Sequence, residues 1–243
     1  FTVQASAAIG ILVAYWLAFV LYPVPPAHLD LSRVAISPGD EIFSGLFAHW
    51  NKNTNAAAAF DVWLFNQFPR TEPFALHAHG YQVLNFFPMI ATVIFGIMAG
   101  QKILESRSKI GVRNWLAGAG LALTIGGLLA AWTVCPLVKS IWTPSWALFS
   151  AGLAMTVLAL LYHVCDLHGP RDWTFPFVVV GTNSLLLYVM SYYGWRILEP
   201  WQLVFGPGIF AGYWGPLLGS VTIAVTLWLL ALALYRFRIF VRI

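Results

Sequence analysis

Six stretches of this chain are almost continuously apolar, and each is about as long as a transmembrane helix. A helix rises about 1.5 Å per residue, so about 20 apolar residues cross the roughly 30 Å hydrocarbon layer of a bilayer. A single buried core does not need six such runs in 243 residues. The pattern predicts an all-α fold, a polytopic transmembrane helix bundle that forms a single domain over residues 1–243. The predicted spans are about 5–22, 86–101, 115–134, 145–164, 174–195 and 214–235.

The composition agrees with a membrane environment. Only 9% of the residues are charged and 60% are hydrophobic, and the mean hydropathy is +0.76. A soluble domain carries about 25% charged residues. We therefore expect an integral membrane protein whose first partner is the lipid bilayer.

The longest segment between spans covers residues 23–82 and contains one short helical pattern. It opens with three prolines, which end a helix: Pro23, Pro25 and Pro26. Residues 56–65 predict a helix capped by Thr54 or Asn55 and ending before Pro69. Three apolar residues of that helix share one face, so we expect it to lie on the membrane surface or to cover the bundle.

A second connecting segment and several small residues add detail to the bundle. Residues 196–213 are predicted to be broken by Pro200 and by the glycines around residue 207. Gly96 and Gly100 have the spacing that lets membrane helices approach closely. The same is expected of the third span, which is rich in Gly and Ala, and of the fourth, which has alanines on one face: Ala147, Ala151 and Ala154.

The basic residues predict the orientation. Cytoplasmic loops of membrane proteins carry an excess of Lys and Arg. If the spans alternate in direction, one side of the membrane holds eight of the 13 Lys and Arg: Lys102, Arg107, Lys109, Arg113, Arg171, Arg236, Arg238 and Arg242. We expect both chain ends in the cytoplasm and residues 23–82 outside. The net charge of +4 flanks the spans, so no nucleic-acid partner is expected.

The Cys and His patterns offer little chemistry. Cys135 and Cys165 bracket the fourth span, about 30 Å apart by helix rise, so we expect no disulfide. His77 and His79 have no Cys or carboxylate ligand close by in sequence, and no metal site is predicted. A histidine is a suitable general base, but the sequence selects none, and the catalytic residues stay unknown.

Polar residues surround the start of the fourth span. Thr143 and Pro144 suit the N-cap and first position of its helix. Lys139 is the one charged residue of this short loop, and it either extends to the headgroups or binds an anion beside the helix start. Trp142 is either an interfacial aromatic residue or a surface on which substrate stacks.

Two asparagines lie at spans, where an amide must find polar partners. Asn183 is followed by Ser184 within the fifth span, and Asn85 lies at the end of the second. Each either holds helices together or faces a substrate.

Several of these residues belong to motifs, and together they resemble the heparan-alpha-glucosaminide N-acetyltransferase family, particularly its bacterial members. The first motif is Pro136-x-x-Lys139-x-x-Trp142-Thr143-x-Ser145. The others are Gly181-x-Asn183-Ser184-x-x-x-Tyr188-Val189 and Tyr235-Arg236-x-x-Ile239-Phe240-x-x-Ile243. Further similarity lies in Asn53-x-Asn55, Phe60-Asp61-x-Trp63, Phe68-Pro69-Arg70 and Gly80-Tyr81-x-x-Leu84-Asn85-Phe86.

The resemblance implies a protein of the bacterial cytoplasmic membrane that transfers acetyl from acetyl-CoA to the amine of a glucosamine at the non-cytoplasmic face. It implies that Asn183 and Ser184 line a channel for acetyl-CoA, with Lys139, Trp142 and Ser145 at its outer end. Lys139 and the basic residues 102–113 are rival partners for the nucleotide phosphates.

Members of this family have further spans at the N-terminus, and the histidine credited with acetyl transfer lies there. The sequence has no matching position, so we expect a C-terminal portion or a trimmed relative. The alternative is a non-catalytic accessory subunit that keeps the acyltransferase-like fold. The expected partners are an amino sugar or glycan, and other membrane subunits or a second copy. A transporter is disfavoured because the spans contain no ionisable pair.

Overall fold

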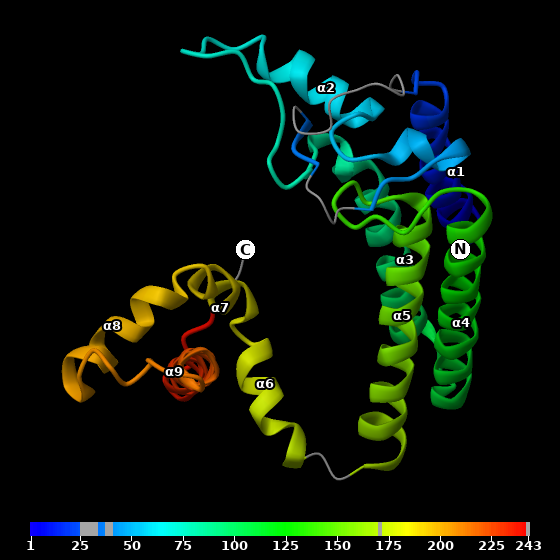
Figure 1. Ribbon diagram of the computed structural model, residues 1–243. Helices are drawn as coiled ribbons and strands as arrows, with labels where there is room; N and C mark the ends of the chain where they lie inside the picture. The colour runs from blue at the N-terminus through cyan, green and yellow to red at the C-terminus, as the bar shows by residue number, and fades with distance from the viewer. Residues whose placement is uncertain (25–33, 37–40, 170–171, 242–243) are drawn as a thin grey trace. The chain divides into compact units, whose positions relative to one another are not determined.

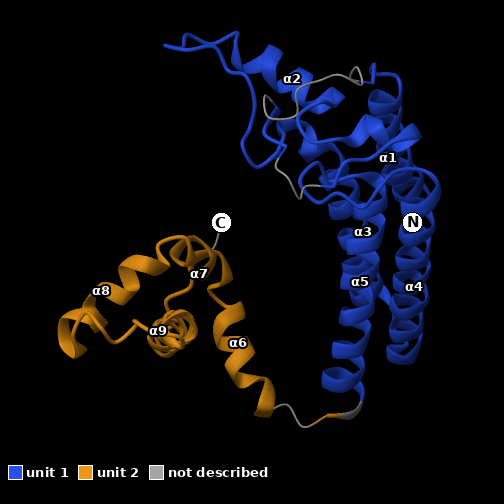
Figure 2. Cartoon of the chain, in the orientation of Figure 1, with its two compact units in different colours: residues 1–168 blue, residues 169–243 orange. Residues whose placement is uncertain are grey.

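The computed structural model describes residues 1–24, 34–36, 41–169 and 172–241. The chain divides into two compact units, residues 1–168 and residues 169–243, which are described separately (Figure 2). Five residues used in the sequence predictions lie outside the described residues: Pro25, Pro26, Arg171, Arg242 and Ile243.

Every regular element in the described residues is helical, as predicted. Unit 1 contains α1 (Thr2–Val20), α2 (Ala56–Phe65), α3 (Phe86–Glu105), α4 (Lys109–Thr133) and α5 (Pro144–Tyr162) (Figure 1). Unit 2 contains α6 (Phe175–Gly181), α7 (Ser184–Ser191), α8 (Gly194–Phe205) and α9 (Gly215–Arg236). Two short 3₁₀ turns, Gly45–Trp50 and Val83–Asn85, and one π-helical turn, His163–His168, complete unit 1.

Five of these helices are long and apolar enough to cross a membrane: α1, α3, α4, α5 and α9. A sixth span is present if α6 and α7, which are bent by 65°, count as one. The predicted span over 174–195 is therefore interrupted at two points, residues 182–183 and residues 192–193. Asn183 has non-helical backbone angles, because its side chain bonds to backbone outside the helix and competes with the helical ladder.

The tightest helix contact in unit 1 joins α4 to α5 through glycines. A Cβ on Gly120 would lie 2.6 Å from the Thr156 hydroxyl, and one on Gly152 would overlap the backbone N of Thr124. Close backbone approach replaces the hydrophobic effect as the source of contact between membrane helices. Gly96 and Gly100 of α3 instead face open space, so the prediction that they pack closely is wrong.

The apolar core of unit 1 lies where α1, α3, α4 and α5 face one another. Leu12, Phe95, Leu116 and Met155 are buried there, together with Ala147 and Ala151 of the predicted alanine face. Ala154, the third member of that face, is exposed. The small side chains at these positions let the four helices approach one another closely.

Two predicted helix starts are confirmed by their caps. The Asn55 side chain accepts a hydrogen bond from the backbone N–H of Ala58, so Asn55 rather than Thr54 caps α2. The Thr143 hydroxyl accepts from the N–H of Trp146, and Pro144 is the first residue of α5. Both caps satisfy backbone N–H groups that a helix start leaves without partners.

We use the name polar cap for residues 41–85 together with the α4–α5 loop, residues 134–143. These segments lie at one end of the unit 1 helices (Figure 1). The Tyr15 hydroxyl of α1 donates to the carbonyl of Ile141 at 2.8 Å, and the Asn85 amide donates to the carbonyl of Ser140. The first bond attaches the cap to α1, and the second joins the two segments of the cap to each other.

Unit 2 is built around α9. Val179, Leu187 and Ala231 are buried in its small core, and the Trp228 indole donates to the carbonyl of Pro176 at 3.1 Å. The prediction that Pro200 breaks this segment is wrong, because α8 continues through it. The helix ends at Gly206, whose φ of 92° suits a residue without a side chain.

Candidate functional site

The polar cap buries an unusual number of polar side chains for so apolar a chain. Asn51, Asn55, Asp61 and Gln82 are each less than a tenth exposed. Asn51 donates to the carbonyl of Phe43 and accepts from its N–H, at 2.9 and 2.8 Å. These two hydrogen bonds join the ends of the segment 43–51 and hold it in one conformation.

Asn53 links three other residues of unit 1, two of which belong to the cap. Its amide nitrogen donates to the carbonyl of His77 at 3.0 Å and to that of Val34 at 2.9 Å. Its oxygen accepts from the Gln82 amide at 3.2 Å. The network fixes the backbone of residues 77–82 beside residue 53.

Asp61 is the most deeply buried charged group of the described residues, with 1% of its side chain exposed. Both carboxylate oxygens accept from the N–H of Val83 at 3.1 Å, at the start of the turn that leads into α3. The Nε2 of His77 lies 3.6 Å from Oδ2. Burial raises the pKa of Asp61, and the Val83 N–H and His77 act in the opposite direction.

A hollow of about 260 Å³ opens in the cap between residues 41–52 and the α4–α5 loop. It is lined by Glu41, Phe43, Trp50, Lys52 and residues 137–141. Two ammonium groups and one carboxylate thus share a space bounded by aromatic and backbone atoms. The Trp50 indole N–H, also buried, has no hydrogen-bond partner among the described residues.

The Lys52 side chain has room beside the hollow because Gly80, which it contacts, has no side chain. A Cβ on Gly80 would lie 2.9 Å from Cγ of Lys52, and Gly80 has a φ of 69°. Its N–H donates to the carbonyl of His77 at 3.0 Å, which closes a turn. The turn that carries His77 therefore packs directly against a residue that lines the hollow.

Three of the predicted site residues lie in the cap: Lys139, Trp142 and Asn85. A fourth, Ser145, is the second residue of α5, and one of the four lines the hollow. Lys139 does so, and its side chain is exposed. Trp142 points elsewhere: its indole donates to the Thr92 hydroxyl at 3.2 Å and its ring contacts Trp146. Trp142 also has a φ of 47°, so the turn before α5 sets its direction.

Ser145 and Asn85 support the walls of the cap. The Ser145 hydroxyl is fully buried and donates to the carbonyl of Pro136 at 2.8 Å. Asn85 holds the carbonyl of Ser140 with its nitrogen, while its buried Oδ1 has no donor among the described residues. Gln82 Oε1 is also buried and has no donor among the described residues. The cap therefore contains two buried acceptors whose hydrogen-bonding capacity the described residues leave unused.

The two remaining predicted residues, Asn183 and Ser184, belong to unit 2. The Asn183 nitrogen donates to the carbonyl of Ile239 at 3.0 Å, and its oxygen accepts from the N–H of Val241 at 2.9 Å. Asn183 is fully buried and Ser184 is exposed. The amide therefore fastens the C-terminal tail to the break between α6 and α7.

Sequence reasoning missed Asp61, His77 and Gln82 as site residues. The available signal was Asp61 itself, a lone acid within the apolar run Ala56–Phe65. A charge on the buried face of a helix needs a partner, and the sequence does not show which residue folds back to provide one.

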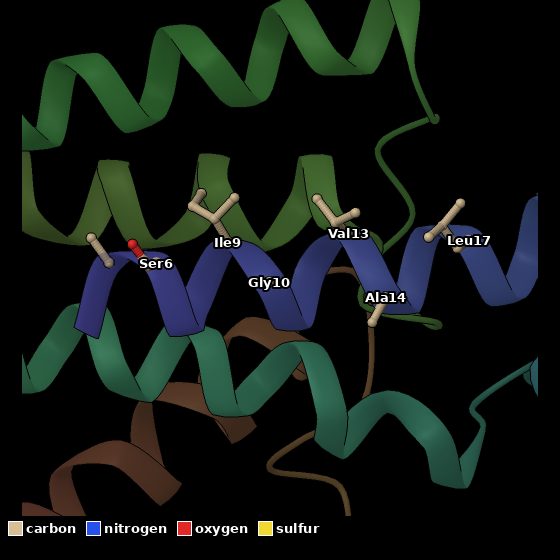
Figure 3. A pocket seen from close by; sticks show the side chains of 7 residues that line it. Ser6, Ile9, Gly10, Val13, Ala14 and Leu17 are labelled. Atoms are coloured by element: carbon tan, nitrogen blue, oxygen red, sulfur yellow. The ribbon is translucent and has the colours of Figure 1, made fainter. Parts of the chain in front are cut away.

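A second hollow, of about 590 Å³, runs along α1 and is almost entirely apolar (Figure 3). Its lining comes from this helix alone, with Ile9, Val13 and Leu17 projecting beside the small residues Ser6, Gly10 and Ala14. Such a surface suits lipid or another helix, since it offers one hydroxyl to a polar substrate.

The cysteines and the metal-ligand residues add no further site. Cys135 and Cys165 are both free thiols. Burial raises the pKa of Cys135, and a hydrogen bond with Ser145 opposes that change. In the part of the chain that the structure describes, no three His, Cys, Asp or Glu residues gather as metal ligands do.

No protein-family model, curated protein or solved structure matches this chain. The site is therefore interpreted from its own residues and from the motifs that carry the family resemblance.

Proposed function

We propose that this protein is a membrane-embedded acyltransferase module that moves acetyl from acetyl-CoA to the amine of an amino sugar such as glucosamine. The acceptor is bound at the polar cap, which we place on the non-cytoplasmic side of a bacterial cytoplasmic membrane. Both chain ends are then cytoplasmic, as the distribution of Lys and Arg favours.

The observation that carries the proposal is the convergence of motif residues in the cap. Asn53, Asn55 and Asp61 come from one part of the sequence, Asn85 from the next, and Lys139 from beyond α4. They line the hollow or lie in the hydrogen-bond network around it. Polar groups buried in so apolar a chain are costly unless they have partners or serve a ligand.

The charges of the hollow fit both substrates. Lys52 and Lys139 are suitable partners for phosphate or thioester oxygens, and Glu41 is a suitable partner for a protonated amine. At about 260 Å³ the space is below the usual 300–1,000 Å³ of ligand sites, so it would hold one end of acetyl-CoA or one sugar ring. Lys139 and the basic residues 102–113 stay rival partners for the nucleotide.

The test is acetyl-CoA binding to the protein in membranes, compared between Lys139→Ala and Arg107→Ala. Both side chains are exposed cations, one in the hollow and one at the α3–α4 loop. If Lys139 contacts the acyl donor, its loss weakens binding about tenfold, the value of one charge-assisted hydrogen bond. Lys139→Arg retains the charge and is the matched control.

The outcomes separate the two rival positions for the nucleotide from a failure of the proposal itself. Weaker binding in Arg107→Ala alone places the nucleotide at the basic loop 102–113. Unchanged binding in both variants removes both residues from the site. Failure of the unaltered protein to bind acetyl-CoA contradicts the acyltransferase proposal.

A second candidate is a non-catalytic accessory subunit, and the apolar hollow along α1 favours it. Ser6, Gly10 and Ala14 have the four-residue spacing at which membrane helices approach closely. This candidate predicts that the protein co-purifies in a fixed ratio with another membrane polypeptide, or as a dimer, and does not bind acetyl-CoA. Gly10→Leu would then dissociate the complex, whereas Gly96→Leu on the open face of α3 would not.

A further inference from the structure

His77 and Asp61 form an arrangement that the proposed function does not yet use. The imidazole Nε2 lies 3.6 Å from a carboxylate oxygen that is almost completely buried, while 38% of the histidine side chain is exposed. A buried carboxylate that orients a partly exposed imidazole is the arrangement found in acid–base catalysis.

The imidazole is held on several sides. The rings of Phe65 and Phe74 contact it with centroids at 5.7 and 4.8 Å. The backbone carbonyl of His77 accepts hydrogen bonds from the Asn53 amide and from the N–H of Gly80. The side chain is therefore positioned by aromatic packing and a fixed turn, in addition to the charge of Asp61.

Asp61 is equally fixed by its contacts. Both of its oxygens bond the N–H of Val83, so the carboxylate cannot turn away from His77 without losing that contact. If the His77 Nε2–H points at the carboxylate, the lone pair of the imidazole is on Nδ1. An ion-pair distance slightly longer than a hydrogen bond is common in such pairs before substrate binds.

Arg70 is a charged residue on the aromatic cluster that contacts His77. Its guanidinium lies 5.2 and 5.3 Å above the rings of Phe65 and Phe74. Tyr15 of α1 interacts electrostatically with Asp61. Asp61 is thus the carboxylate that faces the imidazole, and removing its charge tests the pair directly.

We propose that His77 is the general base of the acetyl transfer and that Asp61 is its positioning residue; this inference rests on the proposed function. The neutral amine of the acceptor attacks the thioester carbonyl, a C–N bond forms and the C–S bond breaks. Nδ1 takes the proton that the nitrogen loses and returns it to the departing thiolate. The products are the N-acetyl sugar and CoA as its thiol, and His77 is neutral again.

The turn that carries His77 also connects the pair to the hollow. Gly80 closes this turn and packs against Lys52, which lines the space proposed for the substrate. Gln82, two residues after Gly80, contributes one of the buried acceptors that lack a donor among the described residues. Hydroxyl and amine groups of a sugar are donors of the kind that these oxygens bind.

The experiment measures acetyl transfer from acetyl-CoA to glucosamine by the protein in membranes, between pH 5 and 9. His77→Gln is expected to lower kcat by about 100-fold, the usual contribution of a general base, and to abolish the fall in rate on the acid side. Imidazole added to His77→Ala restores part of the rate. The control is His79→Gln, at an exposed histidine two residues away. This substitution leaves kcat and the fall in rate on the acid side unchanged.

Asp61→Asn tests the positioning role. It keeps an oxygen for the Val83 N–H but loses the charge, so the rate falls by about tenfold, imidazole does not restore it, and the acid limb moves to lower pH. Acetyl-CoA binding, measured in parallel, shows whether each variant keeps its fold.

The outcomes separate this inference from the function on which it rests. If the unaltered protein transfers acetyl and His77→Gln keeps both the rate and the acid limb, the His77 proposal is overturned and the function stands. If the unaltered protein binds acetyl-CoA but transfers nothing to glucosamine, the proposed function and the inference both fail.

Discussion

The polar cap of unit 1 and the break between α6 and α7 in unit 2 both bury amides in an apolar chain, but they use them differently. In unit 2, Asn183 bonds two backbone groups of the C-terminal tail, one with each end of its amide. In the cap, Gln82 and Asn85 each keep an oxygen without a donor among the described residues, and Asp61 keeps a charge.

The difference shows when a buried polar residue indicates a function. A fold that uses both ends of an amide for its own backbone explains that residue, because unsatisfied groups are what burial penalises. Spare acceptors and a buried charge are not explained in that way. They either lower stability without benefit or serve a ligand, and the two regions predict different responses to mutation.

Asn183→Ala is expected to give the largest change in stability. The tail loses two hydrogen bonds, worth together about 2 kcal/mol, so trypsin cleaves faster after Arg236 and Arg238. Ser184→Ala, at an exposed neighbouring position, is the control. Acetyl-CoA binding that falls together with tail protection would show that Asn183 also lines a channel, as the family resemblance implies.

Asp61→Asn is expected to change stability less, by below about 1 kcal/mol, and in the opposite direction near neutral pH. Burial raises the pKa of Asp61 above its unfolded value of about 4. The folded state therefore keeps its proton where the unfolded state has lost it, and stability declines as pH rises through the folded pKa.

The asparagine variant lacks this decline and keeps the acceptor for Val83. Thermal unfolding of both proteins between pH 4 and 8 should show equal stability at the acid end and a more stable variant at the neutral end. A variant less stable than the unaltered protein at pH 7 would mean that the carboxylate is retained for stability, against its proposed role in chemistry.

Much of the fold was predictable because membrane spans depend on length and hydropathy. The caps of α2 and α5 were predictable for a similar reason, since Asn55 and Thr143 act on backbone within three residues. The break at Asn183 was not, because apolar residues continue on both sides of Gly181–Ser184 and the tail that binds the amide lies far along the chain.

Which helix faces pack together was less predictable than where helices lie. Gly96 and Gly100 have the four-residue spacing that is typical of closely packed membrane helices. The close contacts are nevertheless made by Gly120, Gly127 and Gly152. Spacing shows which face can approach a neighbour, and tertiary structure decides which face has one.

The candidate site was predicted only in part. Lys139 was identified from its isolation in a short loop, and it does line the hollow. The pairing of Asp61 with His77 depends on a turn at Gly80 and on the amide of Asn53, which bring the two residues together in space. No periodicity in the sequence encodes such a contact.

The central claim is that the polar cap faces the non-cytoplasmic side, where the acceptor is bound. It is tested most directly by labelling intact cells with a membrane-impermeant maleimide, using His79→Cys in the cap and Glu105→Cys at the end of α3, both exposed, with Cys165 replaced by Ser. If the cap faces the outside, residue 79 is labelled in intact cells and residue 105 only after permeabilisation. Labelling of residue 105 from outside, with residue 79 protected until the membrane is opened, would contradict the claim.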